Sequence, residues 1–598
     1  MSILDRFGES RGISAAVSAN IGMSIGKIWP GAGTQKAASV PTSNPLSFSL
    51  QSPIVMLLTL ALGIIAVRLP FFDYNVLSAD ESVYLMIGAG MREGHIPYVD
   101  IIDRKPIGIF LIYGLADLLF RDAIIGVRIF GALSTLLGSW ILARIGQRFL
   151  GLGPVAALLS GLLYATYALL FYGDSGQTPV FFMPLVIAGG GLVLRELRRM
   201  RQGRTPSVAR LGWAGLALGL SLQIKYSTFF ECVLFGGLVL LFAWQYRRIL
   251  SRHGIAAALG GAGVMMVGGL LPTAIAYAVY VAMGHGEAFW FYNITVNLGR
   301  PATDFPTGLI LFRALLFMAA VGPLVFLGTR YFIARLKTPE GGSRFACQRW
   351  VHVVLATWFI AALIGGLAQQ QPYATYFFDT LAPLALMAGA TLQSRATSPR
   401  SSRTIAWSAS VVLGLAVAGY VGLHIQKIRD NGSPYLPAAI AEDIKAQGAQ
   451  SMYVFNYYGI MYPMTGIALP TRYPLPDHLL RNLEAASFQF DAKAELTRIF
   501  DNNPSVLMVL NPMSSRIPAD RRAMLEAKLA ADYCLWRNYE AGPQHVSVYL
   551  HKAAPLPSVS AACQAPADPN EWLTAVRKPG DKRRWVRRPA QKTDPTGQ

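Results

Sequence analysis

The stretch SADESVYLMIGAGMREGHIPYVDIIDRKPIG, Ser78 to Gly108, is far more charged than the chain on either side of it. It begins a few residues after an apolar run, Ile54 to Phe72. In a protein that crosses a membrane, charged residues gathered at one membrane interface indicate a site that handles a charged substrate. The alternative is a solvated loop that only marks the boundary with water. The charged residues of interest are Asp80, Glu81, Asp100, Asp103, Arg104 and Lys105.

The composition is that of a membrane protein. Of the 598 residues, 53% are hydrophobic and 14% are charged, with a mean hydropathy of +0.38, whereas soluble domains carry about 25% charged residues. The formal net charge of +20 does not indicate binding to nucleic acid, because most Lys and Arg lie in short segments between apolar runs. Bases in such segments orient a membrane protein by the positive-inside rule.

The apolar runs predict a mainly α-helical, polytopic protein with about eleven spanning helices. Nearly every second run ends in a base-rich segment, such as the six arginines between Arg195 and Arg210. The opposite loops are poor in bases, which places the N-terminus in the cytoplasm and the charged first loop outside. The segment Lys105–Phe120 is short for a crossing and predicts a helix lying in the outer interface. The predicted spans are 54–72, 124–149, 154–172, 180–194, 211–224, 229–244, 255–283, 309–327, 351–367, 377–392 and 405–423.

Composition changes divide the chain into four parts. A Ser-, Gly- and Ala-rich segment, 1–50, predicts a mobile cytosolic arm. The transmembrane domain follows at 51–425. In 426–555, helical spacing at 490–500 and strand-like runs at 504–512 and 545–552 predict a small α/β domain on the outer, periplasmic side. The tail, 556–598, is rich in Pro, Lys and Arg, and we expect it to be disordered.

The four cysteines do not have the spacing of a metal site. Cys534 and Cys563 fall in the C-terminal polar region. If that region faces an oxidising compartment, the two can form a disulfide; otherwise they remain thiols.

The charged first loop carries the candidate chemistry. Asp80 lies close to the membrane surface, where its carboxylate can act as a general base on an acceptor hydroxyl. Lys105 and Arg104 can hold the phosphate of a lipid-linked donor. Pro106 predicts the start of a helix, whose N-terminus adds positive potential for an anion. The alternatives are a helix cap for Asp80 and snorkelling at the interface for Lys105.

Other residues have supporting roles in this hypothesis. We expect Glu81 to bond the backbone or a nearby Arg. Asp100 and Asp103 either orient Lys105 or help to hold a divalent ion, so the need for a metal cofactor stays open. Lys225, at the end of an apolar run, either contacts the lipid carrier or anchors its helix at the interface.

The first loop resembles that of a known family. Its pattern is Asp80-Glu81-x-x-Tyr84, Gly94-x-x-Pro97-Tyr98-x-Asp100 and Asp103-x-Lys105-Pro106. This looks like the first outer loop of GT-C glycosyltransferases, in the branch of bacterial relatives of protein O-mannosyltransferases and of the lipid A aminoarabinose transferase. The resemblance extends more weakly to 215–227, 371–386 and 470–476.

The resemblance implies a GT-C transmembrane fold and sugar transfer from a polyprenyl-phosphate carrier, with inversion at the anomeric carbon. It matches Asp80 to the catalytic carboxylate, Lys105 to the lysine that contacts the donor phosphate, and Asp174 to a second functional carboxylate. The chain departs from the family at Ile107, where many relatives carry a second proline. It also lacks their histidine near Tyr373.

The sequence thus predicts an enzyme of the bacterial inner membrane, with its active site on the periplasmic face. Its expected partners are a polyprenyl-phosphate-linked sugar, a lipid, glycan or protein acceptor of the cell envelope, and membrane lipids. Two other classes of function compete with this one. A transporter of lipid-linked sugars usually shows paired repeats and broken helices, and we find no clear repeat. A non-catalytic assembly subunit of the envelope would use the outer domain for docking.

Overall fold

Helices fill the part of the chain that lies before the C-terminal domain. The computed structural model describes residues 52–72, 74, 79–299, 305–336, 349–393, 399–568, 571–575 and 585–589. The predicted N-terminal arm, 1–50, lies outside these residues. Within the described chain, seven helical stretches are long and apolar enough to cross a membrane: Ala123–Phe149, Pro154–Phe171, Thr178–Arg201, Tyr226–Gln245, Arg252–Ala282, Trp350–Ala368 and Trp407–Ala446.

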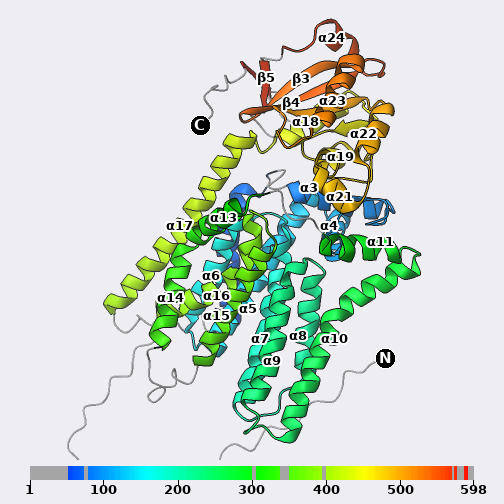
Figure 1. Cartoon of the computed structure of the whole chain (residues 1–598). Coiled ribbons are helices and arrows are strands. Elements are labelled where there is room, and N and C mark those ends of the chain that lie inside the picture. Colours follow the sequence, from blue (N-terminus) through cyan, green and yellow to red (C-terminus); the bar gives the residue numbers. More distant parts are fainter. Residues whose placement is uncertain are drawn as a thin grey trace, which may run out of the picture. The chain divides into compact units, whose positions relative to one another are not determined.

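These stretches contain the long helices of Figure 1. Their bounds are α5 (Ala123–Phe149), α6 (Pro154–Ala168) with η2 (Leu169–Phe171), α7 (Thr178–Arg201), η3 (Tyr226–Thr228) with α9 (Phe229–Gln245), α10 (Arg252–Ala282), α15 (Arg349–Ala368), and α17 (Pro399–Asn431) followed by α18 (Leu436–Ala446). A further pair, α13 (Thr307–Ala320) and α14 (Gly322–Leu336), is bent by 75° and makes an eighth stretch if it crosses as one span.

Each of the eleven predicted spans coincides with helical structure, but three of these helices are short. They are α2 (Pro53–Arg68), α8 (Val208–Leu222) and α16 (Leu381–Gln393), the last preceded by η6 (Ala374–Thr380). By length and composition, seven or eight stretches qualify as spans within the described residues. The mainly helical membrane architecture is therefore confirmed, and the number of eleven spans stays a prediction.

Local sequence explains where the long helices begin and end. Pro154 and Pro179 occupy the first turns of α6 and α7, where a missing backbone N–H costs nothing. The last turn of α7 carries Arg198, Arg199 and Arg201, whose positive charge complements the negative end of the helix dipole. The base-rich segment that predicted a cytoplasmic loop thus also ends the helix.

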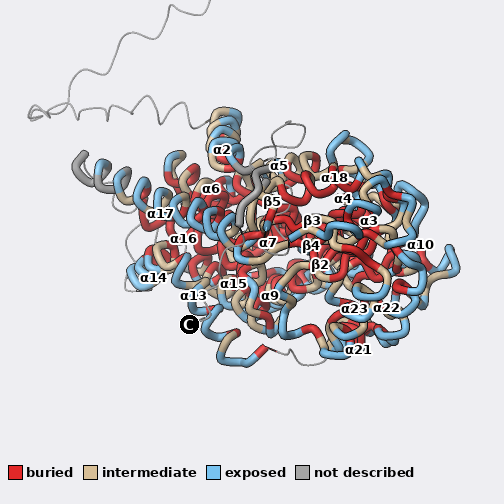
Figure 2. Tube along the Cα trace, turned by 90° about the horizontal axis from the view of Figure 1, so that it is seen from above, coloured by how far each residue is buried: buried red, intermediate tan, exposed pale blue. Residues whose placement is uncertain are grey.

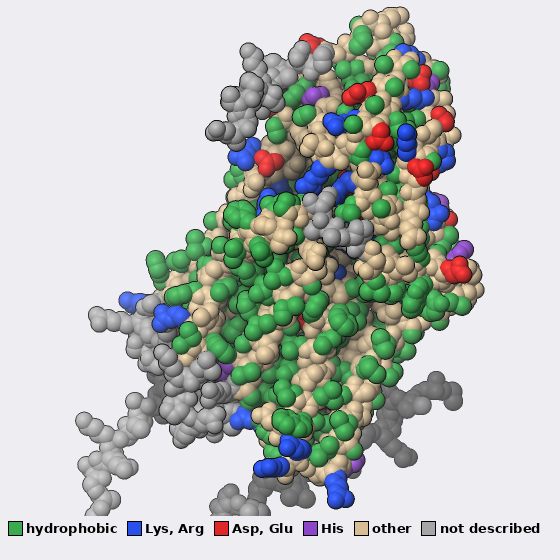
Figure 3. Space-filling model, in the orientation of Figure 1, with side chains coloured by type: hydrophobic (Ala, Val, Ile, Leu, Met, Phe, Trp, Pro, Cys, Tyr) green, Lys and Arg blue, Asp and Glu red, His purple; other side chains and the backbone are tan. Residues whose placement is uncertain are grey.

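Burial separates inner helices from outer ones. In the most apolar 18 residues of α6 with η2, and of α7, 72% of the residues are buried. The corresponding share in α10 is 22%. Figure 2 shows this contrast, with red segments along α7 and pale blue ones on α10. The exposed side chains of α10 include Val267, Leu270 and Ile275, and Figure 3 shows that hydrophobic side chains dominate the surface at this level. A wide apolar surface of this kind suits contact with lipid.

The C-terminal domain follows α17, which leads into it in Figure 1. Its sheet has the order β1-β2-β4-β3-β5-β6. β1 is parallel to β2, β3 and β4 form an antiparallel pair, and β5 is parallel to β3. The strands are β1 (Met452–Val454), β2 (Val506–Asn511), β3 (Tyr533–Ala541), β4 (Gln544–His551), β5 (Glu571–Ala575) and β6 (Trp585–Pro589).

Helices pack on this sheet and enclose a second hydrophobic core. That core includes Phe455, Leu496, Leu507 and Leu525. The helices that contribute to this core are α20 (Pro476–Leu480), α22 (Ala492–Asp501) and α23 (Ala519–Asp532). The domain also contains α19 (Met461–Thr465), α21 (Asn482–Phe488) and α24 (Val559–Gln564). The helix predicted at 490–500 and the strands predicted at 504–512 and 545–552 are present. The boundary at 426 was set too early, because α17 continues to Asn431.

The turn between β3 and β4 packs directly on the end of α17. Gly432, with φ +79°, lies so close to it that an added Cβ would sit 2.9 Å from the Cα of Ala541. A contact between two backbones at this distance requires glycine. The C-terminal domain is therefore joined to the last long helix by a tight backbone contact.

The prediction of a disordered tail from residue 556 is wrong for the described part of that segment. The chain forms α24 and then adds β5 and β6 to the sheet. A disulfide between Cys534 in β3 and Cys563 in α24 joins the segment to the sheet. The amino-acid composition of the tail gave a wrong prediction of disorder. A segment poor in apolar residues can be ordered by a covalent link and by backbone pairing to an existing sheet edge.

Loss of this disulfide should destabilise the C-terminal domain. The bond closes a loop with a sequence separation of 29, and restriction of the unfolded chain by such a loop contributes about 3 kcal/mol. We expect Cys563→Ser to lower the thermal midpoint of the C-terminal domain, measured by differential scanning calorimetry of the purified protein. Reductant should lower the midpoint of the wild type and leave that of the variant unchanged. Equal midpoints for wild type and variant would contradict the stabilising role.

Candidate active site

Two helices flank the charged loop and bring its ends together. α3 (Ala79–Arg92) carries Asp80 in its first turn, and α4 (Ile107–Leu119) begins directly after Pro106. The helices pack against each other, so that Asp80 Oδ1 lies 3.7 Å from Lys105 Nζ. The two residues that the sequence singled out, 25 positions apart by their numbers, therefore form an ion pair at the centre of the site.

The surroundings of Asp80 keep it ionised and reachable. Burial alone raises its pKa, but the ammonium groups of Lys105 and Lys225 lower it, and the net pKa lies below the ordinary value of 3.8. Gln177 Nε2, from the second outer loop, lies 3.5 Å from Asp80 Oδ2. The side chain of Asp80 is 46% exposed, so a hydroxyl group can approach the carboxylate.

Lys105 is held in place by its neighbours in the loop. Asp103 is buried and accepts a hydrogen bond from the backbone N–H of Lys105 (2.7 Å), while the hydroxyl of Tyr98 donates to the Lys105 carbonyl (2.7 Å). The ammonium lies 5.3 Å from the ring centre of Tyr84. Asp103 thus contacts the backbone of Lys105, and its role in orienting the lysine stays a prediction. Asp100 instead closes its own turn by accepting from the backbone N–H of Ile96 (2.7 Å).

Tyr98 is a residue to which the sequence gave no role. It is fully buried, has φ 68° and packs edge-on against Phe110 and Phe289. A non-glycine residue in this backbone region costs free energy and often marks a functional site. Its position between Pro97 and Asp100 in the quoted pattern was the available signal.

Lys225 supplies a second cation near Asp80. It precedes η3, is buried, and places its ammonium 4.0 Å from the ring centre of Tyr376 in η6. Burial lowers the pKa of Lys225. The ring of Tyr376 contacts the ammonium of Lys225.

Glu81 ties the first loop to the second. It forms an ion pair with Arg128 of α5, in which both side chains are at most 5% exposed. Its Oε1 also accepts a hydrogen bond from the backbone N–H of Gly176 (2.6 Å). A Cβ on Gly176 would lie 2.0 Å from the hydroxyl oxygen of Tyr113, so this approach requires glycine. Both partner types predicted for Glu81 are present. Arg128 was missed, although an arginine within an apolar run is itself a functional signal.

Asp174 lies in the second outer loop and is enclosed by α17. Its Oδ2 lies 2.9 Å from His424 Nε2 and accepts a hydrogen bond from the hydroxyl of Tyr420 (3.2 Å). Burial raises the pKa of Asp174, but the hydrogen bond from His424 and the charge of Lys427 outweigh it, and the net pKa is lowered. The side chain is 5% exposed. In this arrangement Asp174 holds the second loop against α17.

Within the described residues, no group of three or more His, Cys, Asp or Glu side chains is arranged to hold a metal ion.

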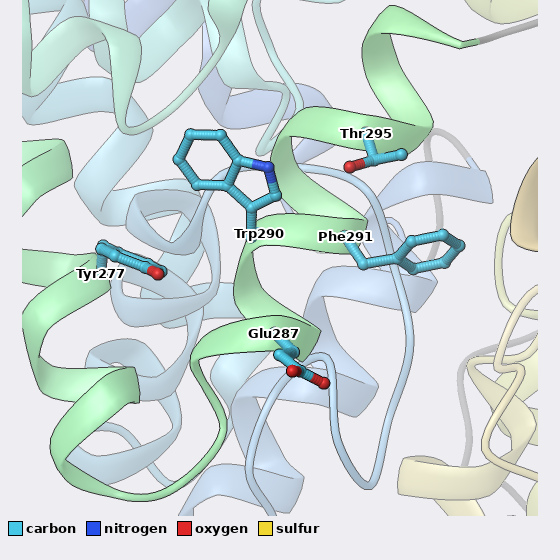
Figure 4. A pocket seen from close by; sticks show the side chains of 5 residues that line it. All are labelled: Tyr277, Glu287, Trp290, Phe291 and Thr295. Carbon is cyan, nitrogen blue, oxygen red and sulfur yellow. The ribbon is translucent and has the colours of Figure 1, made fainter.

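A separate open hollow of about 450 Å³ lies where α10 meets α11 (Gly286–Trp290) and η4 (Phe291–Thr295). Figure 4 shows its lining. The lining residues are Tyr277, Glu287, Trp290, Phe291 and Thr295.

Known proteins resemble this chain in sequence and in fold. No protein-family model matches it. A curated protein of Pseudomonas fluorescens, an undecaprenyl phosphate-alpha-4-amino-4-deoxy-L-arabinose arabinosyl transferase, is 26% identical over 402 residues. The match covers 64% of this chain and 63% of the relative, so the chain spans less than two thirds of that protein's length.

The solved structures of ArnT from Cupriavidus metallidurans give the fold. The form bound to undecaprenyl phosphate aligns with a TM-score of 0.53 at 17% identity, over 83% of this chain and 97% of ArnT. The apo form gives the same TM-score at 16% identity. The chain thus shares the fold of ArnT and is similar in sequence to an arabinosyl transferase, and both findings support the GT-C resemblance of its first charged loop.

Proposed function

We propose that the protein is an integral membrane glycosyltransferase that moves a sugar from a polyprenyl-phosphate donor to an acceptor of the bacterial cell envelope. The observation that carries this proposal is the pairing of Asp80 with Lys105 at 3.7 Å, with Lys225 close enough to influence the same carboxylate. One reachable carboxylate beside two ammonium groups suits a reaction in which a hydroxyl loses a proton and a phosphate leaves.

The proposed reaction is a single displacement that inverts the anomeric carbon. The carboxylate of Asp80 takes the proton of the acceptor hydroxyl, and the acceptor oxygen attacks the anomeric carbon. The bond between that carbon and the phosphate oxygen breaks, and polyprenyl phosphate leaves with the electron pair. Lys105 and Lys225 stabilise the charge that develops on the phosphate, a contribution of a few kcal/mol.

Donor binding would also prepare Asp80 for its role. The ammonium of Lys105 lowers the pKa of Asp80 in the structure, and a lower pKa makes a weaker base. A donor phosphate that approaches Lys105 adds negative charge and competes for the ammonium. Both effects raise the pKa of Asp80, so its basicity increases when the donor is bound.

The orientation follows from charge and from the disulfide. The connection between α9 and α10 holds Arg247 and Arg248, and α10 begins at Arg252. Figure 3 shows Lys and Arg gathered at that end. Such a base-rich end is typical of the cytoplasmic side. The disulfide between Cys534 and Cys563 suits the oxidising periplasm. We therefore assign the site and the C-terminal domain to the periplasmic face of the inner membrane.

The reaction class can be tested with purified protein in nanodiscs. A panel of polyprenyl-phosphate sugars would be mixed with envelope fractions from cells that lack the protein, which supply lipid, glycan and protein acceptors. We expect release of free polyprenyl phosphate together with a glycosylated acceptor. If no donor gives release while the protein remains folded, the proposal is wrong, and donor movement across vesicle membranes would then test a transporter.

Lys105→Ala should impair use of the donor. Removal of one cation that faces a developing charge costs about 10²–10³-fold in rate, and weaker phosphate binding should raise the donor KM. Steady-state release of polyprenyl phosphate at varied donor concentration measures both. Arg92→Ala is the matched control, because it removes a cation at the end of α3, and the ion pair of Arg92 with Asp117 leaves it 58% exposed. A donor KM equal to that of the wild type would favour snorkelling at the interface.

A further inference from the structure

A charged contact joins the C-terminal domain to the first loop. Arg104 Nη1 lies 2.6 Å from Glu484 Oε2, and Nη2 lies 3.5 Å from Oε1. Glu484 belongs to α21, and the ring of Phe488 from the same helix lies 6.0 Å from the guanidinium carbon. The two paired residues are 380 positions apart in the chain. The C-terminal domain therefore reaches the residue that directly precedes Lys105.

The backbone of this segment is held as well. The N–H of Ile102 donates to the carbonyl of Arg472 in the C-terminal domain (2.8 Å). The carbonyl of Arg104 accepts from Asn297 Nδ2 (2.9 Å), which belongs to α12 (Val296–Leu298). Both the backbone and the side chain of Arg104 are thus engaged by parts of the protein outside the loop.

The ion pair is largely buried, so each charged side chain depends on the other to compensate its charge. The side chains of Arg104 and Glu484 are 20% and 7% exposed. Removing one member of a largely buried ion pair leaves the other without compensation. A guanidinium binds a carboxylate with a planar fork of N–H groups, and Glu484 occupies both terminal nitrogens. In the proposed reaction, the cations that face the donor phosphate are therefore the ammonium groups of Lys105 and Lys225.

We propose that Glu484 is a positioning residue for the transfer reaction. Glu484 acts by fixing Arg104, which is not a direct ligand of the donor phosphate. By fixing Arg104, the C-terminal domain holds Lys105 at its distance from Asp80. This inference rests on the proposed glycosyltransferase function. It gives the C-terminal domain a part in building the active site.

The test uses the full-length protein in nanodiscs and four variants: Glu484→Gln, Arg104→Glu, Glu484→Arg and the double variant with both charges exchanged. Displacing a reacting group by about 1 Å can cost about 10²-fold in rate, so we expect Glu484→Gln to lower kcat/KM by about 10²-fold, with a raised donor KM. The single charge reversals should be at least as impaired. The double variant should recover at least 10-fold over either, because it restores the pair in reversed order.

A second readout separates positioning from a loss of fold. Hydrogen exchange of the loop at 97–106 should accelerate in Glu484→Gln and slow again in the double variant. The control is Asp532→Asn, which breaks an ion pair with Lys528 in α23 of the same domain. It should leave kcat/KM and exchange of the loop unchanged.

The outcomes distinguish this inference from the function on which it rests. If the wild type transfers no sugar, the proposed function is wrong, and loop exchange alone then decides whether Glu484 holds the loop. If the wild type is active and Glu484→Gln matches it in kcat/KM and exchange, the positioning role is refuted. If the double variant is folded but recovers nothing, Arg104 contacts the donor directly, and the inference is overturned.

Discussion

Asp80→Asn is expected to lower the rate of sugar transfer by about 10²–10⁴-fold, the contribution of a positioned general base. Asparagine keeps the size of the side chain and can still interact with Gln177, which lies 3.5 Å from the carboxylate. It cannot accept the proton of the acceptor hydroxyl. Because the side chain is 46% exposed, the substitution should leave the thermal midpoint within a few degrees of that of the wild type.

Single-turnover release of polyprenyl phosphate, with protein in excess over donor, would measure this loss at the chemical step. Asp117→Asn is the control, because it removes a carboxylate from α4 whose partner Arg92 is largely exposed. Donor affinity, measured separately by equilibrium binding, should fall little in Asp80→Asn. A transfer rate within threefold of the wild type would remove Asp80 from the proposed mechanism and leave it as a partner of Lys105.

The second large effect concerns stability. Glu81→Gln should lower the free energy of unfolding by about 3–5 kcal/mol, because it leaves the buried guanidinium of Arg128 without its counter-charge. The neutral amide can still accept from the backbone N–H of Gly176, so the loss comes chiefly from the ion pair. Thermal unfolding in detergent, followed by tryptophan fluorescence, would report the change as a lower midpoint.

Two comparisons make the cause of that loss clear. Glu495→Gln removes a pair with Arg498, which is 50% exposed, and should cost at most about 1 kcal/mol. The double variant Glu81→Gln/Arg128→Met removes the stranded charge and should be more stable than Glu81→Gln alone. If the single and double variants melt together, the stability does not depend on compensation of Arg128.

Some of the site was predictable because its signals are local in sequence. Asp80 and Lys105 stand out as charges between apolar runs, and the helix after Pro106 follows from the proline. Their contact at 3.7 Å required only that α3 and α4 pack on each other. The alternation of apolar and basic segments similarly located the helices of the membrane domain.

The partners of these residues were not predictable in the same way. Glu484 is one charged residue among many in a polar domain, and nothing near it in sequence indicates that it meets Arg104. His424 directly follows an apolar run and gives no sign that it contacts Asp174. Such contacts depend on how distant helices pack. The tail was misjudged for a related reason, since a disulfide and a sheet edge order it, and its own composition does not.

The separation of Arg104 and Glu484 also sets the order in which the proposed active site is completed during biosynthesis. The first loop leaves the ribosome 380 residues before its partner. At about 5–20 residues per second, synthesis of the intervening chain takes roughly 20–75 s. For that time the first loop exists without Glu484, while later helices are made. Any nascent chain that stops before the C-terminal domain therefore carries Asp80 and Lys105 but lacks the contact that, in our proposal, holds their separation fixed.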